Sequence, residues 1–126
     1  DGAHNPAGTA ALAASLPEIT TGRPLTLCVG VRDDKDAAEM LRELLPQADA
    51  LVATRAGDER SLPPATLLSL AAQLGFTGQA EAVADPQAAL ARARYLAGPD
   101  GVVLATGSIY LVADLLAPDR AIRSVL

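Results

Sequence analysis

The residues most able to bind a ligand or take part in a reaction stand at the start of the sequence. Asp1 and His4 precede Asn5 and Pro6, and a run rich in Ala and Leu follows. Asn5 is a favourable N-cap, and Pro6 suits the first helical turn, where no N–H is needed. We therefore expect Asp1 and His4 on a turn before a helix N-terminus, where free N–H groups and the helix dipole favour an anion such as phosphate. The simpler alternative is an ordinary loop-to-helix junction.

Two further polar segments follow predicted strands. In the segment Arg32–Asp36, Lys35 could reach a phosphate. Gly107 and Ser108 precede the last predicted helix; Ser108 is expected to cap it, and its hydroxyl could hold a carboxylate together with the Gly107 backbone. Ligands of open α/β sheets collect at the carboxyl ends of the strands. These two segments and Asp1–Asn5 therefore form one candidate binding edge.

Other chemistries have less support. Ser108, His4 and Asp1 are the types of a nucleophilic triad, but no nucleophile-elbow spacing surrounds Ser108. One cysteine, Cys28, and one histidine give neither a disulfide nor a zinc site, and Cys28 is expected in the core. The sequence contains no G-x-x-x-x-G-K-[ST] phosphate loop, so ATP chemistry is not complete within this chain.

Length and charge narrow the class of protein. The 126 residues suffice for one domain with a core, and half of them are hydrophobic. The net charge of −5 and the absence of Lys/Arg clusters argue against nucleic acid or an anionic membrane as partner. No run of about 18 apolar residues and no signal peptide is present. We therefore expect a cytoplasmic protein.

The hydrophobic pattern predicts the elements that position these residues. Strands are expected at 25–31, 50–54, 79–83 and 102–106. Helices are expected at 6–16, at 37–45 with Asp36 as cap, at 63–74, and at 109–116. A further helix is expected from Pro86, with Asp85 as its N-cap, to the turn at 98–101. Residues 17–24 read as a surface connection. The alternation predicts a Rossmann-like, mostly parallel three-layer α/β/α sheet.

Position 1 falls where a strand would be expected to have just finished. This suggests one domain, residues 1–126, cut from a longer protein, although a sheet without that strand is an alternative.

Four motifs in sequence order carry a family resemblance. The string Asp1–Pro6 and the ending Thr106–Val112 are specific together, whereas Gly30–Asp36 and the pair Thr54-Arg55 are weak alone. This combination resembles the C-terminal domain of folylpolyglutamate synthase/dihydrofolate synthase, a branch of the Mur-ligase family. The loop at 55–62 departs from the family's proline-containing pattern, so no site is assigned to it.

The resemblance implies part of an ATP-dependent, ADP-forming amide ligase. Such an enzyme adds L-glutamate to dihydropteroate, or to the γ-carboxylate of a (poly)glutamyl folate, through an acyl phosphate. ATP and Mg²⁺ would be bound mainly by a central P-loop domain that this sequence lacks, so the isolated chain would be inactive.

The resemblance also implies residue roles. ATP would be bound by Asp1, His4, Asn5 and Lys35, with Asp1 on the ribose side. His4 would be catalytic, beside the phosphates or the incoming glutamate. Glutamate would be bound by His4 and Ser108. Two alternatives remain open: a stand-alone Rossmann-like module for a nucleotide or carboxylate, and a domain of a peptidoglycan-precursor Mur ligase.

Overall fold

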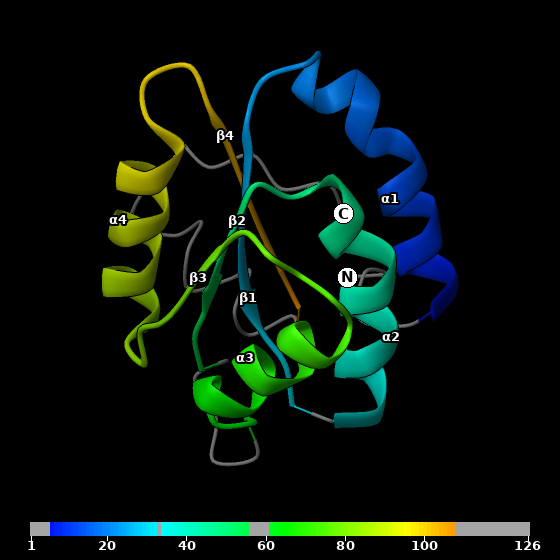
Figure 1. Cartoon of the computed structure of the whole chain (residues 1–126), viewed down its shortest axis with the longest axis vertical. Helices are drawn as coiled ribbons and strands as arrows, with labels where there is room; N and C mark the ends of the chain where they lie inside the picture. The colour runs from blue at the N-terminus through cyan, green and yellow to red at the C-terminus, as the bar shows by residue number, and fades with distance from the viewer. Residues whose placement is uncertain (1–5, 33, 56–60, 108–126) are drawn as a thin grey trace.

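The computed structural model describes residues 6–32, 34–55 and 61–107, which form a parallel sheet covered by helices on both faces (Figure 1). The four described strands lie in the order β3-β2-β1-β4, and every neighbouring pair is parallel. The Rossmann-like α/β prediction is thus confirmed. The elements are α1 (Pro6–Thr20), β1 (Leu25–Gly30), α2 (Asp34–Leu44), the 3-10 turn η2 (Leu45–Gln47), β2 (Ala50–Ala53), α3 (Pro64–Gln73), β3 (Gln79–Ala82), α4 (Pro86–Ala97) and β4 (Val102–Gly107).

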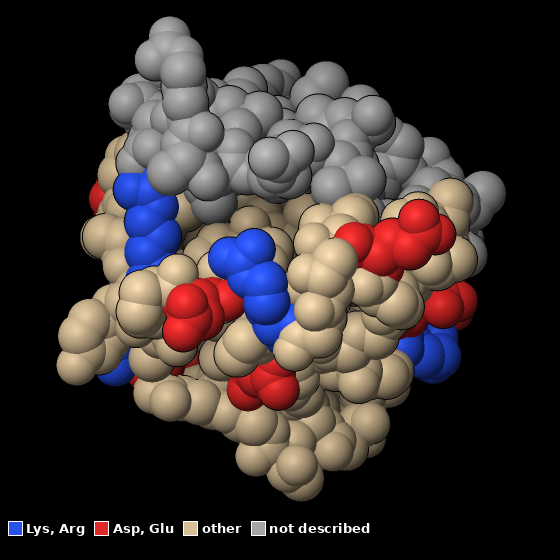
Figure 2. Space-filling model, turned by 90° about the horizontal axis from the view of Figure 1, so that it is seen from above, with Lys and Arg blue, Asp and Glu red and all other residues tan. Residues whose placement is uncertain are grey.

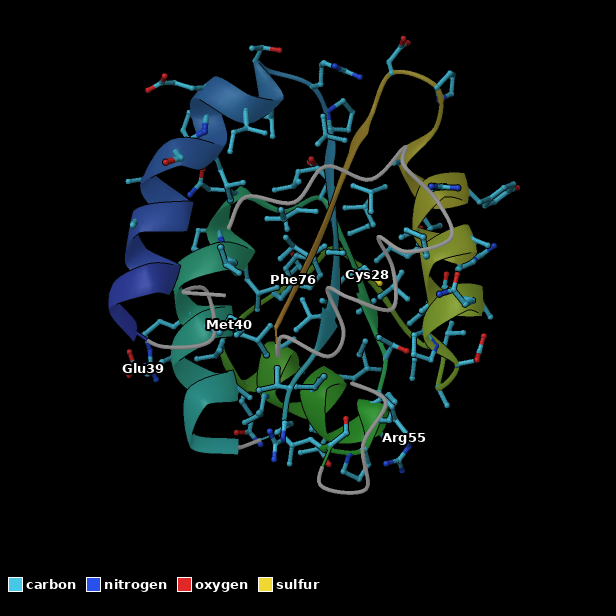
Figure 3. All side chains as sticks on the ribbon, turned by 180° about the vertical axis from the view of Figure 1, so that it is seen from behind. Cys28, Glu39, Met40, Arg55 and Phe76 are labelled. Carbon is cyan, nitrogen blue, oxygen red and sulfur yellow. The ribbon has the colours of Figure 1, made fainter. Side chains whose placement is uncertain are left out.

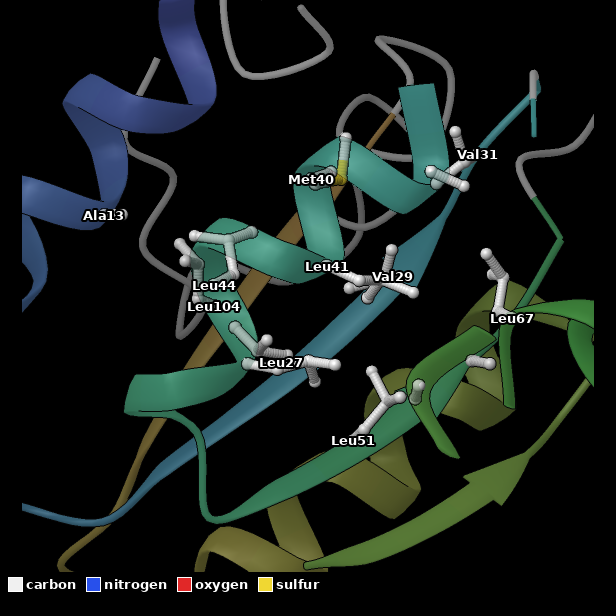
Figure 4. Close-up of a cluster of buried hydrophobic side chains, with 14 of the residues drawn as sticks. Ala13, Leu27, Val29, Val31, Met40, Leu41, Leu44, Leu51, Leu67 and Leu104 are labelled. Carbon is white, nitrogen blue, oxygen red and sulfur yellow. The ribbon is translucent and has the colours of Figure 1, made fainter. Parts of the chain in front are cut away.

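The larger part of the core lies between the sheet and the layer of α1, α2 and α3. Met40, Leu41 and Leu44 of α2 lie over Leu27 and Val29 of β1, and all five are buried (Figure 4). Their spacing along α2 is that of one helical face, whereas the two β1 residues are two apart, as one face of a strand requires. Full burial of each such side chain contributes about 1.5–3 kcal/mol.

The opposite face of the sheet is covered by α4 with small side chains. Cys28 and Val52 of the two central strands meet Ala89, Leu90 and Ala93 of α4. Small residues allow the helix to approach the sheet closely, and Cys28 is a core residue as predicted. Asp85 caps α4 as its composition predicts: the carboxylate accepts a hydrogen bond from the Ala88 N–H at 2.8 Å.

The first helix is longer than predicted. It continues through Pro17 to Thr20, where a surface connection was expected, and the Thr21 N–H donates to the Pro17 carbonyl at 3.0 Å. Proline normally ends a helix because it has no N–H for the carbonyl four residues earlier, here that of Ala13. That carbonyl instead accepts a hydrogen bond from Gln47 Nε2 at 2.7 Å. A tertiary contact therefore replaces the missing helical one.

The second helix starts earlier than predicted. It begins at Asp34 rather than at 37, so Lys35 and Asp36 belong to its first turn instead of the preceding loop. Asp36 therefore lies inside the helix, and the prediction that it is the N-cap is wrong. Acidic residues in a first turn interact favourably with the helix dipole, which explains why this polar stretch is helical. The helix predicted at 109–116 lies outside the described residues.

Candidate functional site

The carboxyl ends of the parallel strands form one edge of the sheet, at the lower end of Figure 1. The register pairs Gly30 of β1 with Gly107 of β4, and Val29 of β1 with Ala53 of β2. The strand ends are therefore level. Helix α1 runs antiparallel to β1, and α2 follows β1 directly, so the N-terminal ends of both helices face this edge; α2 begins at the edge, whereas α1 begins beside the middle of α2 (Figure 1). We call it the carboxyl edge.

Main-chain hydrogen bonds fix the strand exits to one another at the carboxyl edge. The Thr54 N–H donates to the Val29 carbonyl, and the Leu62 N–H donates to the Val31 carbonyl, both at 2.8 Å. The Thr54 side chain is completely buried, and its hydroxyl donates to the Ala84 carbonyl at 3.1 Å. These hydrogen bonds join the exits of β1, β2 and β3, which we call the strand-exit platform.

Two arginines follow adjacent strands of this platform. Arg32 lies two residues beyond the end of β1, and Arg55 lies two residues beyond the end of β2. Arg55 is exposed, and its guanidinium donates to the Ser61 carbonyl at 3.4 Å (Figure 3). A guanidinium has five N–H donors, so Arg55 retains donors for a carboxylate or phosphate. The sequence pattern Thr54-Arg55 was the only signal for this residue, and no site was assigned to it.

The structure describes the sequence neighbours of the predicted site residues, but not the side chains of those residues. Asp1, His4, Asn5 and Ser108 lie outside the described residues, and so does the Lys35 side chain, although the Lys35 backbone lies in the first turn of α2. Of their sequence neighbours, Gly107 ends β4 at the carboxyl edge, and Pro6 is the first residue of α1, whose N-terminal end faces this edge. Whether the five side chains meet therefore stays a prediction.

Titratable groups elsewhere in the described residues serve structure. Burial raises the pKa of the Cys28 thiol to about 12, so this thiol is protonated and a poor nucleophile. A hydrogen bond from Arg92 lowers the pKa of Glu81, which accepts from the guanidinium at 2.7 and 2.8 Å. The pair joins β3 to α4 and lies on the outer strand of the sheet rather than at the strand exits.

Neither a metal cluster nor a membrane-spanning helix occurs in the part of the chain that the structure describes. No three His, Cys, Asp or Glu side chains there are grouped as metal ligands. No helix there is long and apolar enough to cross a membrane.

The opposite edge of the sheet has a cavity of about 410 Å³. It lies between the end of α2 and the loop from α3 to β3, and its lining includes Leu41, Arg42, Asp49, Leu74 and Phe76. Figure 2 views the molecule from the end where β1 and β4 start and shows acidic and basic side chains interspersed. The cavity thus lies at the opposite end of the strands from the carboxyl edge.

Comparison with known proteins agrees with this architecture. The family described as Mur ligase, glutamate ligase domain, matches residues 1–109. A probable bifunctional folylpolyglutamate synthase/dihydropteroate synthase of Haloferax volcanii is 40% identical over 118 residues, which cover 90% of this chain and 13% of that protein.

Two solved structures are similar over most of the chain. Folylpolyglutamate synthase of Mycobacterium tuberculosis, complexed with ADP and AMPPCP, matches with a TM-score of 0.78 and 29% identity over 92% of this chain and 28% of that one. Folylpolyglutamate synthase of Thermotoga maritima matches with a TM-score of 0.74 and 30% identity over 94% of this chain and 27% of that one. This chain thus spans less than a third of each relative. It belongs to the Mur ligase family, as a glutamate ligase domain.

Proposed function

We propose that this chain is the C-terminal domain of an ATP-dependent amide ligase that adds L-glutamate to dihydropteroate or to the γ-carboxylate of a (poly)glutamyl folate. The observation that carries the proposal is the match of residues 1–109 to a glutamate ligase domain in which α2 begins and β4 ends at the carboxyl edge. The similar proteins are folylpolyglutamate synthases, one of them complexed with adenine nucleotides.

The proposed reaction has two balanced steps. The carboxylate oxygen of the pteroate or folate attacks the γ-phosphorus of ATP, which gives an acyl phosphate and releases ADP. The amine of glutamate then attacks the acyl carbon, an amide bond forms, and phosphate leaves with a proton lost from the amine. ATP and Mg²⁺ supply the activation and are held mainly by a domain outside this chain.

The carboxyl edge suits the second step. In the proposal, Asp1 contacts the ribose side of the nucleotide, Asn5 and Lys35 contact the phosphates, and His4 lies beside the phosphates and the incoming glutamate. Ser108 binds a glutamate carboxylate. Because hydrogen bonds join the strand exits, closure of this domain would bring these groups to the acyl phosphate together and exclude water that would hydrolyse it.

The decisive experiment uses the whole enzyme that contains this chain. Purified enzyme is supplied with ATP, Mg²⁺, glutamate and either dihydropteroate or a folate, and ADP release and the glutamylated product are measured. We expect the His4→Ala variant to lose about 10²-fold in kcat/KM, in the range of a lost general acid or base. The exposed residue Gln73 on α3 provides the control, since Gln73→Ala should retain full turnover.

The outcomes separate the competing functions. Glutamylation of a peptidoglycan precursor in place of a folate would assign the other branch of the family. Specific nucleotide binding by the 126-residue chain alone, with no ligase activity in the whole protein, would indicate a binding module. Wild-type kinetics in His4→Ala would remove that residue from the site. We further propose that the enzyme acts in the cytoplasm, where ATP is available.

A further inference from the structure

The guanidinium of Arg55 has donors that the fold does not use. Arg42 and Arg92, by comparison, are each paired with a glutamate carboxylate at 2.7 Å. Arg55 donates to the neutral carbonyl of Ser61 at 3.4 Å, and no carboxylate of the described residues pairs with it. One long bond to a neutral acceptor leaves most of its five N–H groups available, in the fork that binds a carboxylate through two of them. This exposed side chain is therefore suited to an anionic ligand.

The main chain beside Arg55 is fixed at the carboxyl edge. The N–H of Arg55 and the hydroxyl of Thr54 both donate to the Ala84 carbonyl, at 3.4 and 3.1 Å. Ser61, which accepts from the guanidinium, is followed by a residue whose N–H donates to the Val31 carbonyl, directly beyond β1. The guanidinium therefore lies close to the exit of β1 as well as to that of β2 (Figure 3).

The strand order places a ligand crevice one strand away from Arg55. The chain runs from β1 to β2 and β3 on one side, with α2 and α3 on one face, and then crosses the other face through α4 to β4, on the other side of β1. Ligands of open α/β sheets bind where the strand order reverses in this way, here between β1 and β4. These two strands end in the paired glycines Gly30 and Gly107, which carry no side chains. Two strand spacings, about 10 Å, separate the exits of β4 and β2.

We infer that Arg55 binds an α-carboxylate of the glutamyl tail of a folate acceptor. The inference rests on the proposed function, in which the γ-carboxylate at the end of the tail reacts while each glutamyl residue keeps its α-carboxylate. A γ-linked residue spans about 6 Å, because two carbon–carbon bonds are added to the ordinary main-chain repeat. With the reacting end in the crevice, one or two glutamyl residues therefore reach Arg55. Dihydropteroate has no glutamyl residue, so Arg55 determines specificity for glutamylated acceptors.

Steady-state kinetics of the whole enzyme test the inference with dihydropteroate, a monoglutamyl folate and a diglutamyl folate as acceptors. We expect Arg55→Ala to raise KM for both folates about tenfold, at the lower end for a lost hydrogen bond to a charged group, and to change kcat less than twofold. KM for dihydropteroate should change less than twofold. Arg55→Lys keeps the charge without the fork, so its KM values for the folates should be intermediate.

Arg42→Ala is the matched control, because it removes an exposed arginine from the last turn of α2, at the other end of that helix from the carboxyl edge. It makes the same change in net charge and should leave every KM unchanged. Circular dichroism verifies that each variant is folded.

The outcomes separate this inference from the proposed function. An equal rise of KM for dihydropteroate and the folates, a rise confined to ATP or glutamate, or unchanged folate KM values in an enzyme that ligates glutamate would each overturn the inference alone. A wild-type enzyme that ligates no glutamate would contradict the proposed function, and the inference would fall with it. Calorimetric titration of the whole enzyme with diglutamyl folate gives a readout without turnover: Kd should rise about tenfold in Arg55→Ala and stay constant in Arg42→Ala, and an unchanged Kd in Arg55→Ala would also refute the contact.

Discussion

The pairing of Pro17 with Gln47 makes a quantitative prediction about stability. Replacing Gln47 by Ala removes a hydrogen bond with a net value of about 1 kcal/mol and leaves the carbonyl of a buried residue, Ala13, without that donor, at a further cost of about 1–3 kcal/mol. Water reaches part of the site, because Gln47 is only half-buried. We therefore expect Gln47→Ala to lower the free energy of unfolding by about 2 kcal/mol.

The same substitution should cost much less when Pro17 is also replaced. In Pro17→Ala, the new N–H at position 17 can donate to the Ala13 carbonyl within the helix. Gln47→Ala should then cost only about 0.5 kcal/mol, because no acceptor is left unsatisfied. The expected coupling free energy between the two positions is thus about 1.5 kcal/mol, well above the deviations seen for independent sites.

Urea unfolding of the four chains at 25 °C, followed by circular dichroism, measures this coupling. Midpoints should shift while the slope with urea stays constant, since the surface exposed on unfolding is the same. Gln73→Ala, an exposed helical glutamine without this contact, should change stability by no more than about 0.5 kcal/mol. Equal costs of Gln47→Ala with and without Pro17 would refute the argument that the hydrogen bond exists to satisfy the carbonyl that proline leaves free.

Three further predictions concern buried and paired groups. Burial raises the pKa of the Cys28 thiol from 9.0 to about 12, so this thiol should resist alkylation at pH 8 until urea unfolds the chain. The stability that the buried, protonated thiol contributes is complete below pH 9 and is lost as the pH rises towards 12. Cys28→Ala should therefore flatten the fall of the urea midpoint at alkaline pH. The hydrogen bond from Arg92 lowers the pKa of Glu81, so the pH dependence of stability has the opposite sign. The stability that Glu81 contributes is present above the usual pKa of glutamate and is lost as the pH falls. Glu81→Gln should therefore reduce the fall of the urea midpoint at acidic pH. Thr54→Val should cost about 1 kcal/mol in urea unfolding, because it removes the hydroxyl that donates to the Ala84 carbonyl, whereas Thr54→Ser should cost less.

Local patterns predicted most of the fold. Continuous apolar runs identified β1 and β2, and the pair Asp85-Pro86 identified the start of α4, because each signal depends only on neighbouring residues. The failure at Pro17 has a clear physical reason. Its compensating partner, Gln47, donates to a residue 34 positions away, and no local pattern records such a contact.

The site was less predictable than the fold. Family resemblance supplied the roles of Asp1, His4 and Ser108, and the family itself is confirmed, but these side chains lie outside the described residues. The apolar periodicity that predicted α2 begins at Ala37, so it missed the polar first turn and misplaced Lys35 in a loop. Arg55 was passed over because its loop departs from the family pattern, although the exits of β1, β2 and β3 are joined beside it.

Helix direction supports the proposal that this acidic domain presents its carboxyl edge to anionic substrates. Helices that cross between parallel strands begin at the carboxyl ends of those strands, and each helix N-terminus carries about half a positive charge. The edge with the 410 Å³ cavity receives the negative helix ends instead. A chain with a net charge of −5 repels anions as a whole, so any attraction of the proposed substrates must be local. Arg32 and Arg55, each two residues beyond its strand, add charge where the helix dipoles already favour anions.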